Sequence, residues 1–484
     1  MDEASTVPPH PLDVKPAGNA FTAAYNLRNT SGGLFSALAD ELIIQILEFL
    51  DGSSLLRVGA TCKVLYAFAA ADDLWKTLFI EKPHDQFIWR GTWRRTFLDL
   101  ETHRESKIPC TGLFSDLLYR PHFCTHTSIL PYATNIPQQN KIPRLENLDQ
   151  EAFSSYWVDK PFILTLPVKE WPVYQQWSMH ALLRQYADVV FRAEAVDWPF
   201  HTYIEYMKDC HDESPLYLFD RAFVEKMKLK VGTEGEKDAA YWVPSCFGED
   251  LFEVLENERP DSRWLIIGPE RSGSTFHKDP NATRHVCSFG VSMPAWNAVL
   301  QGSKYWIMFP QSETMPPPPG VYVSKDQSEV TSPLSVTEWL LGFHAEARKT
   351  RGCLEGICGE GEVLHVPSGW WHLVVNLTHS VAITQNFVPR GHLAASLLFL
   401  RNRPEQVSGF KAAIKDPYVL YVQRMKETHP ELLEEAFADI ARWDVPKSKK
   451  KRKWDELIYH GEEKTTAGGF SFGFAEDESE ECNA

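Results

Sequence analysis

Between Arg263 and Phe387 the sequence is built from short apolar runs separated by glycine and proline. These runs are rich in β-branched and aromatic residues. They are Trp264-Leu265-Ile266-Ile267, Ala298-Val299-Leu300, Tyr305-Trp306-Ile307-Met308-Phe309, Glu362-Val363-Leu364-His365-Val366 and Val381-Ala382-Ile383-Thr384. Short strands separated by turn residues are typical of an antiparallel barrel or jelly roll. The segment therefore predicts a β-barrel domain, which limits the folds open to the rest of the chain.

Helical patterns flank this strand-rich segment on both sides, so we predict an α+β chain. Near the N-terminus, apolar residues recur at helical spacing until Asp51-Gly52 breaks the run. They are Leu38, Leu42, Ile46, Leu47 and Leu50. Beyond Arg401 the helical pattern returns, from Tyr418 to Ile440.

Changes in composition divide the 484 residues into six regions. We expect a disordered leader, a helical module, a connecting region, the strand-rich domain, C-terminal helices, and a basic run followed by a disordered acidic tail. Their bounds are 1–33, 34–80, 81–159, 160–400, 401–445 and 446–484. No apolar run approaches the roughly eighteen residues of a membrane helix, and the N-terminus lacks the pattern of a secretory signal. We therefore expect an intracellular protein without a membrane anchor.

A metal site is predicted inside the strand-rich domain. On an extended segment His277 and Asp279 share one face, because side chains alternate with period two. His372, delivered by the turn at Pro367-Ser368-Gly369, would add a second imidazole. Two histidines and one carboxylate form the facial triad that binds Fe(II), whereas zinc is more often tetrahedral. Six of the 17 histidines precede an acidic residue by two positions, so the spacing alone is weak evidence and the strand context carries the prediction.

The helical module resembles an F-box, the module that docks onto the Skp adaptor of cullin-RING ubiquitin ligases. The resemblance lies in Glu41-Leu42, Phe49-Leu50-Asp51, Cys62-Lys63 and Leu74-Trp75, and Ala39 departs from the usual proline. The alternative is an internal helical hairpin packed on the next domain. An F-box should leave Leu38, Leu42, Ile46 and Leu50 partly exposed, whereas a core hairpin should bury them.

The strand-rich domain resembles the JmjC oxygenases over residues 160–400. The motifs are Gly268–Gly273 before His277, Ala295–Ala298, Gly302–Lys304, and Gly369–His372 through Thr384–Phe387. They are most similar to the branch of the jumonji lysyl hydroxylase and arginine demethylase, and to its fungal F-box-bearing relatives. The resemblance implies a double-stranded β-helix with an N-terminal F-box.

The same resemblance implies Fe(II) and 2-oxoglutarate as cofactors, with His277, Asp279 and His372 as catalytic metal ligands. The distal carboxylate of 2-oxoglutarate needs a buried cation and hydroxyl groups, and charge-assisted hydrogen bonds of that kind are strong. The residues expected to bind it are Lys304, Tyr217 and Thr384, with Asn297 at the iron-proximal end and Asn376 as a supporting candidate.

Each cosubstrate residue also has a structural interpretation. Lys304 could be an exposed hairpin lysine, Tyr217 and Thr384 core hydroxyls, and Asn297 a turn cap. Other residues are expected to be structural, namely Trp306, Trp370 and Trp371 in the core, and His285 and His365. Residues 284–294 have no counterpart in relatives and are interpreted as a surface loop or a retained intron in the gene model.

The implied activity is hydroxylation or demethylation of a protein side chain, a lysine or a methylated arginine or lysine, histones included. The sequence does not choose between these outcomes, and it gives neither the substrate nor the oligomeric state. A different hypothesis is a substrate receptor of a Skp/cullin ligase whose barrel recognises the target, and a third is a catalytically silent cupin-like fold.

The run Lys447–Lys453 predicts a nuclear localisation signal, or a contact with RNA or chromatin, against the alternative of a solvated helix face. A reporter fused to residues 440–460 that stayed cytoplasmic would contradict the nuclear interpretation.

Overall fold

The computed structural model describes residues 7–82, 87–101, 107–279, 293–311, 315–323, 330–331, 335–404, 407 and 409–443. The predicted basic run, the acidic tail and residues 284–292 of the predicted loop lie outside these ranges. The chain divides into two units, Met1–Leu433 and Glu434–Ala484. The described part of the second unit is the C-terminal portion of one helix, ending at Trp443.

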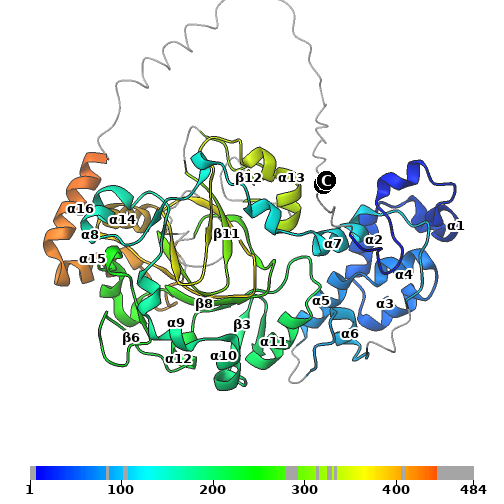
Figure 1. Ribbon diagram of the computed structural model, residues 1–484, viewed down its shortest axis with the longest axis horizontal. Helices are drawn as coiled ribbons and strands as arrows, with labels where there is room; N and C mark the ends of the chain where they lie inside the picture. Colours follow the sequence, from blue (N-terminus) through cyan, green and yellow to red (C-terminus); the bar gives the residue numbers. More distant parts are fainter. Residues whose placement is uncertain are drawn as a thin grey trace, which may run out of the picture. The chain divides into compact units, whose positions relative to one another are not determined.

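Two sheets curl into a barrel at the centre of the first unit (Figure 1). The strands are β1 Arg144–Leu145, β2 Phe162–Leu164, β3 Val190–Ala193, β4 Val196–Pro199, β5 Leu218–Asp220, β6 Val231–Gly232, β7 Tyr241–Trp242, β8 Arg263–Gly268, β9 Gly273–His277, β10 Ala295–Gln301, β11 Lys304–Phe309, β12 Tyr322–Val323, β13 Val330–Thr331, β14 Leu354–Cys358, β15 Glu362–Val366, β16 Trp371–Asn376 and β17 Ser380–Asn386. The larger sheet has the order β1-β2-β15-β10-β17-β8-β5-β3-β4, and the smaller one β14-β11-β16-β9.

The chain passes repeatedly between these two sheets. Strands β8, β10, β15 and β17 belong to the larger sheet, and β9, β11, β14 and β16 to the smaller. Every pairing among these strands is antiparallel. This alternation is the double-stranded β-helix, so the predicted fold class is confirmed.

The barrel strands are apolar on both faces, because one face packs against the main core and the other faces the barrel interior. The outer face of the larger sheet contributes Trp296, Leu265 and Ile383 to the main core of the first unit. The inner face is lined by Ala295, Val299 and Val366, among others. The interior of the barrel holds a cavity.

Helices surround the barrel and form the N-terminal module. They are α1 Leu27–Ser31, α2 Asp40–Glu48, α3 Gly52–Gly59, α4 Lys63–Ala69, α5 Asp72–Glu81, α6 Trp93–Phe97, α7 Asp116–His126, α8 Gln150–Ala152, α9 Pro172–Gln176, α10 Met179–Tyr186, α11 Phe200–Lys208, α12 Phe223–Lys226, α13 Val336–Ala347, α14 Leu393–Asn402, α15 Pro417–Thr428 and α16 Pro430–Trp443. Within the described part of the chain, none of these helices is long and apolar enough to span a bilayer.

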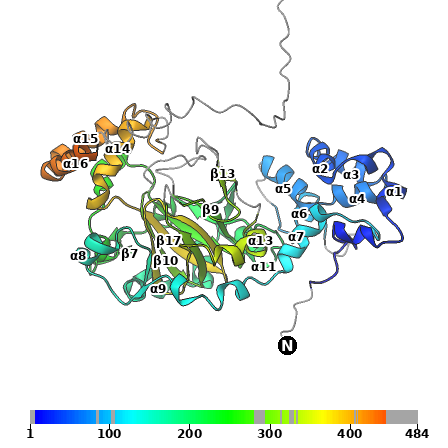
Figure 2. The same cartoon turned by 90° about the horizontal axis from the view of Figure 1, so that it is seen from above.

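Helices α2–α6 form a compact group (Figure 2), which is called the helical module from here on. The exposure of α2 separates the F-box interpretation of this module from the internal-hairpin interpretation. Leu42 and Ile46 are 47% and 44% exposed, and the adjoining Phe49 is 90% exposed. Leu38 and Leu50 are half-buried. An internal hairpin would bury these side chains, so the exposed row favours a surface that meets a partner.

The leader differs from its predicted disorder over residues 7–33. Val14 and Leu27 are buried, and backbone hydrogen bonds join Lys15 to Leu113 and Leu27 to Gly112. The few apolar residues of the leader are sufficient because they add to an existing core instead of building their own. Its first six residues lie outside the described chain.

Candidate active site

Two histidines and an aspartate converge on one point inside the barrel. His277 ends β9, and His372 lies directly opposite on β16. Asp279 lies two residues after His277, and its Oδ1 is 3.9 Å from His277 Nε2 and 3.6 Å from His372 Nε2. One ligand atom from each side chain lies within 4.8 Å of the others, so the three could hold one metal ion.

Backbone carbonyl groups fix the orientation of both imidazole rings. Nδ1 of His277 donates to the Thr275 carbonyl at 2.8 Å, and Nδ1 of His372 donates to that of Trp370 at 3.1 Å. A carbonyl oxygen can only accept, so the proton sits on Nδ1 and Nε2 keeps its lone pair. Histidine ligands are commonly held in this way by an outer hydrogen bond. Both rings therefore present a metal-binding nitrogen toward Asp279.

The pKa shifts of His277 and Asp279 favour the forms that bind a cation, a neutral imidazole and a carboxylate. Burial, together with the neighbouring His372, lowers the pKa of His277 to about 4. Burial alone would raise the pKa of Asp279, but the adjacent imidazoles outweigh it and lower that pKa. Burial opposes the charged form of His372, yet the Asp279 carboxylate raises the pKa of that ring. Asp279 is thus the negative group and His277 the neutral one.

A buried lysine forms no salt bridge with any residue that the structure describes. Lys304, at the start of β11, is fully buried, and its Nζ donates to the Tyr217 hydroxyl at 2.5 Å, Asn376 Oδ1 at 2.8 Å and Ser380 Oγ at 3.1 Å. All three acceptors are neutral. Burial accordingly lowers the pKa of Lys304 to about 7. A buried ammonium surrounded by neutral groups fits the carboxylate of a small ligand.

A cavity of about 240 Å³ is lined by the metal-binding residues and by the cosubstrate candidates Tyr217, Asn297 and Thr384. Asn297 is 4% exposed, and its Oδ1 has no hydrogen-bond partner in the described chain. A buried amide oxygen without a partner is costly unless a ligand or water completes it. The donor set, the isolated ammonium and this amide together fit ferrous iron and a dicarboxylate.

Thr384 lines the cavity and its hydroxyl donates to the Trp296 carbonyl at 2.8 Å, so its role toward the cosubstrate stays a prediction. Ser380, four residues earlier on the same face of β17, provides the hydroxyl at the lysine. Ser380 was not among the predicted residues, although it lies an even number of positions from Thr384 and therefore on the same strand face. Asn376 supports Lys304 and not the metal ligands.

The structure also describes Trp306 and His365, two residues that were predicted to be structural. Trp306 is buried as expected but lines the cavity, with its ring centre 5.9 Å from that of His372. His365 is fully buried and its Nδ1 bonds to the Lys160 carbonyl at 3.1 Å, as a structural histidine should. His285 lies outside the described residues.

Two family models match this chain. Residues 150–391 match the model described as a cupin-like domain, and residues 36–81 match the F-box-like model. The first match covers half of the chain and contains all seven residues predicted for the metal and the cosubstrate.

Curated relatives extend over most of the chain. The arginine-specific demethylase JMJ22 of Arabidopsis thaliana is 36% identical over 459 residues, which cover 90% of this chain and 87% of the relative. The bifunctional arginine demethylase and lysyl-hydroxylase psr-1 of Caenorhabditis elegans is 31% identical, over 60% of this chain and 68% of the relative. The 2-oxoglutarate and iron-dependent oxygenase JMJD4 of Danio rerio is 28% identical, over 34% and 36%.

Proposed function

This chain belongs to the cupin-like JmjC oxygenases and carries an F-box-like domain, and on that premise we propose that it oxidises a lysine or a methylated arginine or lysine of a protein substrate. Its class is that of the protein hydroxylases and demethylases, which use iron and 2-oxoglutarate. The observation that carries the proposal is a three-ligand metal cluster on a cavity that Tyr217 also lines, together with the buried Lys304 ammonium that donates to the Tyr217 hydroxyl.

Some residues of the barrel would bind iron and 2-oxoglutarate, and others would orient the residues that bind them. Iron and 2-oxoglutarate, when bound, supply the oxidising power that converts a C–H bond to C–OH. His277, Asp279 and His372 would hold the iron through two Nε2 atoms and one carboxylate oxygen, which leaves positions open for other ligands. Lys304 would hold the far carboxylate of 2-oxoglutarate, with Tyr217 and Asn376 fixing its ammonium.

Hydroxylation and demethylation need the same residues and differ in the substrate carbon that is presented. Oxidation of a carbon in the lysine chain gives a stable alcohol. Oxidation of an N-methyl carbon gives an unstable product that releases formaldehyde, so the net reaction is demethylation. The products therefore identify the reaction.

The test is an anaerobic Fe(II) titration, followed by 2-oxoglutarate turnover with a panel of arginine, methyl-arginine, lysine and methyl-lysine peptides. We expect one iron per chain and peptide-dependent succinate formation. Formaldehyde from methylated peptides would identify a demethylase, and a peptide mass gain of one oxygen a hydroxylase. A protein that binds no iron, or forms no succinate with any peptide, would contradict the proposal.

A second function, substrate receptor of a Skp/cullin ligase, is favoured by the exposed apolar side chains of Leu42, Ile46 and Phe49, which we call the α2 row. Leu42, Ile46 and Phe49 present apolar surface on the F-box-like domain. Exposed apolar side chains of this kind commonly become the buried centre of an interface. The two functions are compatible, because the α2 row and the barrel cavity use different residues.

Replacing both Leu42 and Ile46 with aspartate is expected to weaken binding of a Skp-type adaptor by at least about 100-fold, because two apolar anchors are lost and two charges must be desolvated. Calorimetry with purified adaptor would measure this change. Turnover of 2-oxoglutarate should be retained.

The matched control is Leu130→Asp, which places a charge on another exposed leucine, 59% exposed and outside the module. It should bind the adaptor normally. Equal losses in the double variant and the control, or no loss in either, would argue against the α2 row as the docking surface.

A further inference from the structure

One carboxylate joins the helical module to the barrel domain. Asp212 lies in the connection between α11 and β5 and its side chain is only 8% exposed. It accepts hydrogen bonds from Trp93 Nε1 at 2.9 Å, the Tyr206 hydroxyl at 2.8 Å and Lys76 Nζ at 3.4 Å. Trp93 and Lys76 belong to α6 and α5, whereas Tyr206 belongs to α11. Asp212 is therefore shared between the two parts.

The helical side of this connection is itself fixed. Both oxygens of the Asp72 carboxylate, at the start of α5, accept backbone N–H groups, from Trp93 at 3.0 Å and from Arg94 at 2.8 Å. These bonds cap α6 and hold it against α5. Trp93 is 1% exposed, so its indole N–H has a defined direction toward Asp212.

On the barrel side, hydrogen bonds connect Tyr206 with the segment that carries Tyr217, a residue of the predicted cosubstrate site. The Tyr206 hydroxyl that donates to Asp212 also accepts the N–H of Leu216 at 2.7 Å. On the other side of residue 217, the Tyr203 hydroxyl accepts the N–H of Leu218 at 3.1 Å. The residue held between these two bonds is Tyr217, whose hydroxyl is 2.5 Å from Lys304 Nζ.

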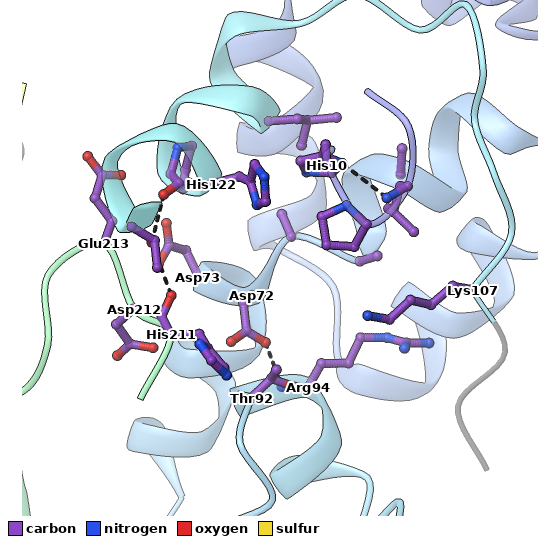
Figure 3. A pocket seen from close by; sticks show the side chains of 18 of the residues that line it. His10, Asp72, Asp73, Thr92, Arg94, Lys107, His122, His211, Asp212 and Glu213 are labelled. Carbon is purple, nitrogen blue, oxygen red and sulfur yellow. Dashed lines mark hydrogen bonds between the residues drawn. The ribbon is translucent and has the colours of Figure 1, made fainter. Parts of the chain in front are cut away.

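Aromatic side chains pack around the junction. The rings of Trp89, Trp93 and Tyr206 pack edge to face or tilted against one another, with centres 4.9 to 6.0 Å apart. Beside them lies a cavity of about 490 Å³, whose wall includes Asp72 and Asp212 (Figure 3).

We propose that Asp212 is a positioning residue of the oxygenase site, which holds Tyr217 and hence Lys304 in place through Tyr206, with Trp93 of the helical module as its anchor. The inference rests on the proposed role of Lys304 in binding 2-oxoglutarate. It makes the helical module a structural support of the cosubstrate site in addition to its adaptor-facing role.

Two conservative variants test this in the full chain. Trp93→Phe removes the indole N–H together with part of the ring system, and Asp212→Asn removes the charge but keeps the size. Anaerobic titration of the Fe(II)-loaded protein with 2-oxoglutarate should show a dissociation constant raised about tenfold in each, the effect of losing one hydrogen bond to a charged group. The maximal turnover rate at saturating 2-oxoglutarate should stay within about twofold, because the metal ligands are untouched.

The matched control is Trp75→Phe. Trp75 is fully buried in the same module, and its indole N–H donates to the Ala69 carbonyl at 2.8 Å, within the module. This variant loses an equivalent hydrogen bond and should bind 2-oxoglutarate like the wild type. Thermal unfolding of all three variants checks that they are folded at the assay temperature.

The outcomes separate this inference from the function it rests on. Wild-type binding in Trp93→Phe and Asp212→Asn, or equal weakening in Trp75→Phe, would overturn the positioning role and leave the oxygenase proposal intact. A wild-type chain that does not bind 2-oxoglutarate would overturn both. A weakened affinity confined to the two junction variants, with the maximal rate retained, would support the inference.

Discussion

Replacing His277 with alanine is expected to reduce peptide-dependent succinate formation by on the order of 1,000-fold or more. The change removes one of three side chains that converge on a single point, and the remaining pair, Asp279 and His372, cannot define the same geometry. Loss of a mere supporting hydrogen bond at a metal site typically costs 10- to 100-fold, so loss of a ligand should cost more. Anaerobic iron binding should fall in parallel with turnover, whereas adaptor binding should be unchanged.

His429→Ala is the matched control for this experiment. His429 also precedes an acidic residue by two positions, which makes it equivalent to His277 by spacing alone. Its Nε2 faces Glu249 at 3.4 Å, far along the chain from the metal cluster. Full activity in His429→Ala with none in His277→Ala would show that the strand context, and not the spacing, creates the site. Normal iron stoichiometry in His277→Ala would contradict the assignment.

The relation between His277, Asp279 and His372 could be anticipated because it depends mainly on strand alternation. Period two places His277 and Asp279 together, and a turn that returns the chain to a neighbouring strand brings His372 opposite. The family resemblance assigned Tyr217 and Lys304 to the same carboxylate of 2-oxoglutarate, and the structure brings the two side chains into contact. That His372 faces His277 also depends on the register of β16 against β9, which residue spacing alone does not give.

Ser380 shows a further place where the register could not be predicted. Alternation places Thr384 and Ser380 on the same face of β17, and only the register decides which hydroxyl reaches Lys304. In the structure Thr384 pairs with Asn297 of β10 and donates to the adjacent Trp296 carbonyl, while Ser380 reaches the lysine. Register arises from pairing across the whole sheet, which short motifs do not report.

The barrel and its flanking helices were also predictable, since short apolar runs and helical spacing are local signals. The ordered leader was not, because its apolar residues are too sparse to predict a core of their own. Val14 and Leu27 become buried only through contact with residues about 85 to 100 positions later, such as Gly112 and Leu113. The Asp212 junction is likewise invisible in sequence, since its three partners come from three separate elements.

Lys304→Met is expected to weaken 2-oxoglutarate binding by about 100-fold, since truncating one partner of a buried charge pair costs several kcal/mol. Methionine keeps much of the volume, so the fold should survive, and the buried charge that the free protein must accommodate is removed. Anaerobic titration of the Fe(II)-loaded variant with 2-oxoglutarate measures the loss. Lys208→Met, at a side chain 60% exposed and paired only with Glu205, should bind normally.

The pH dependence of binding distinguishes a charge effect from a change of shape. Burial lowers the pKa of Lys304 to about 7 in the free protein, and a carboxylate ligand favours the protonated form. Affinity in the wild type should therefore be full below pH 7 and fall as the pH rises above it, by up to about tenfold per unit. In Lys304→Met this decline should disappear and leave a weak, level profile between about pH 6.5 and 8.5. A wild-type affinity that is constant across this range, or a variant that retains the decline, would show that Lys304 does not bind the ligand as a cation.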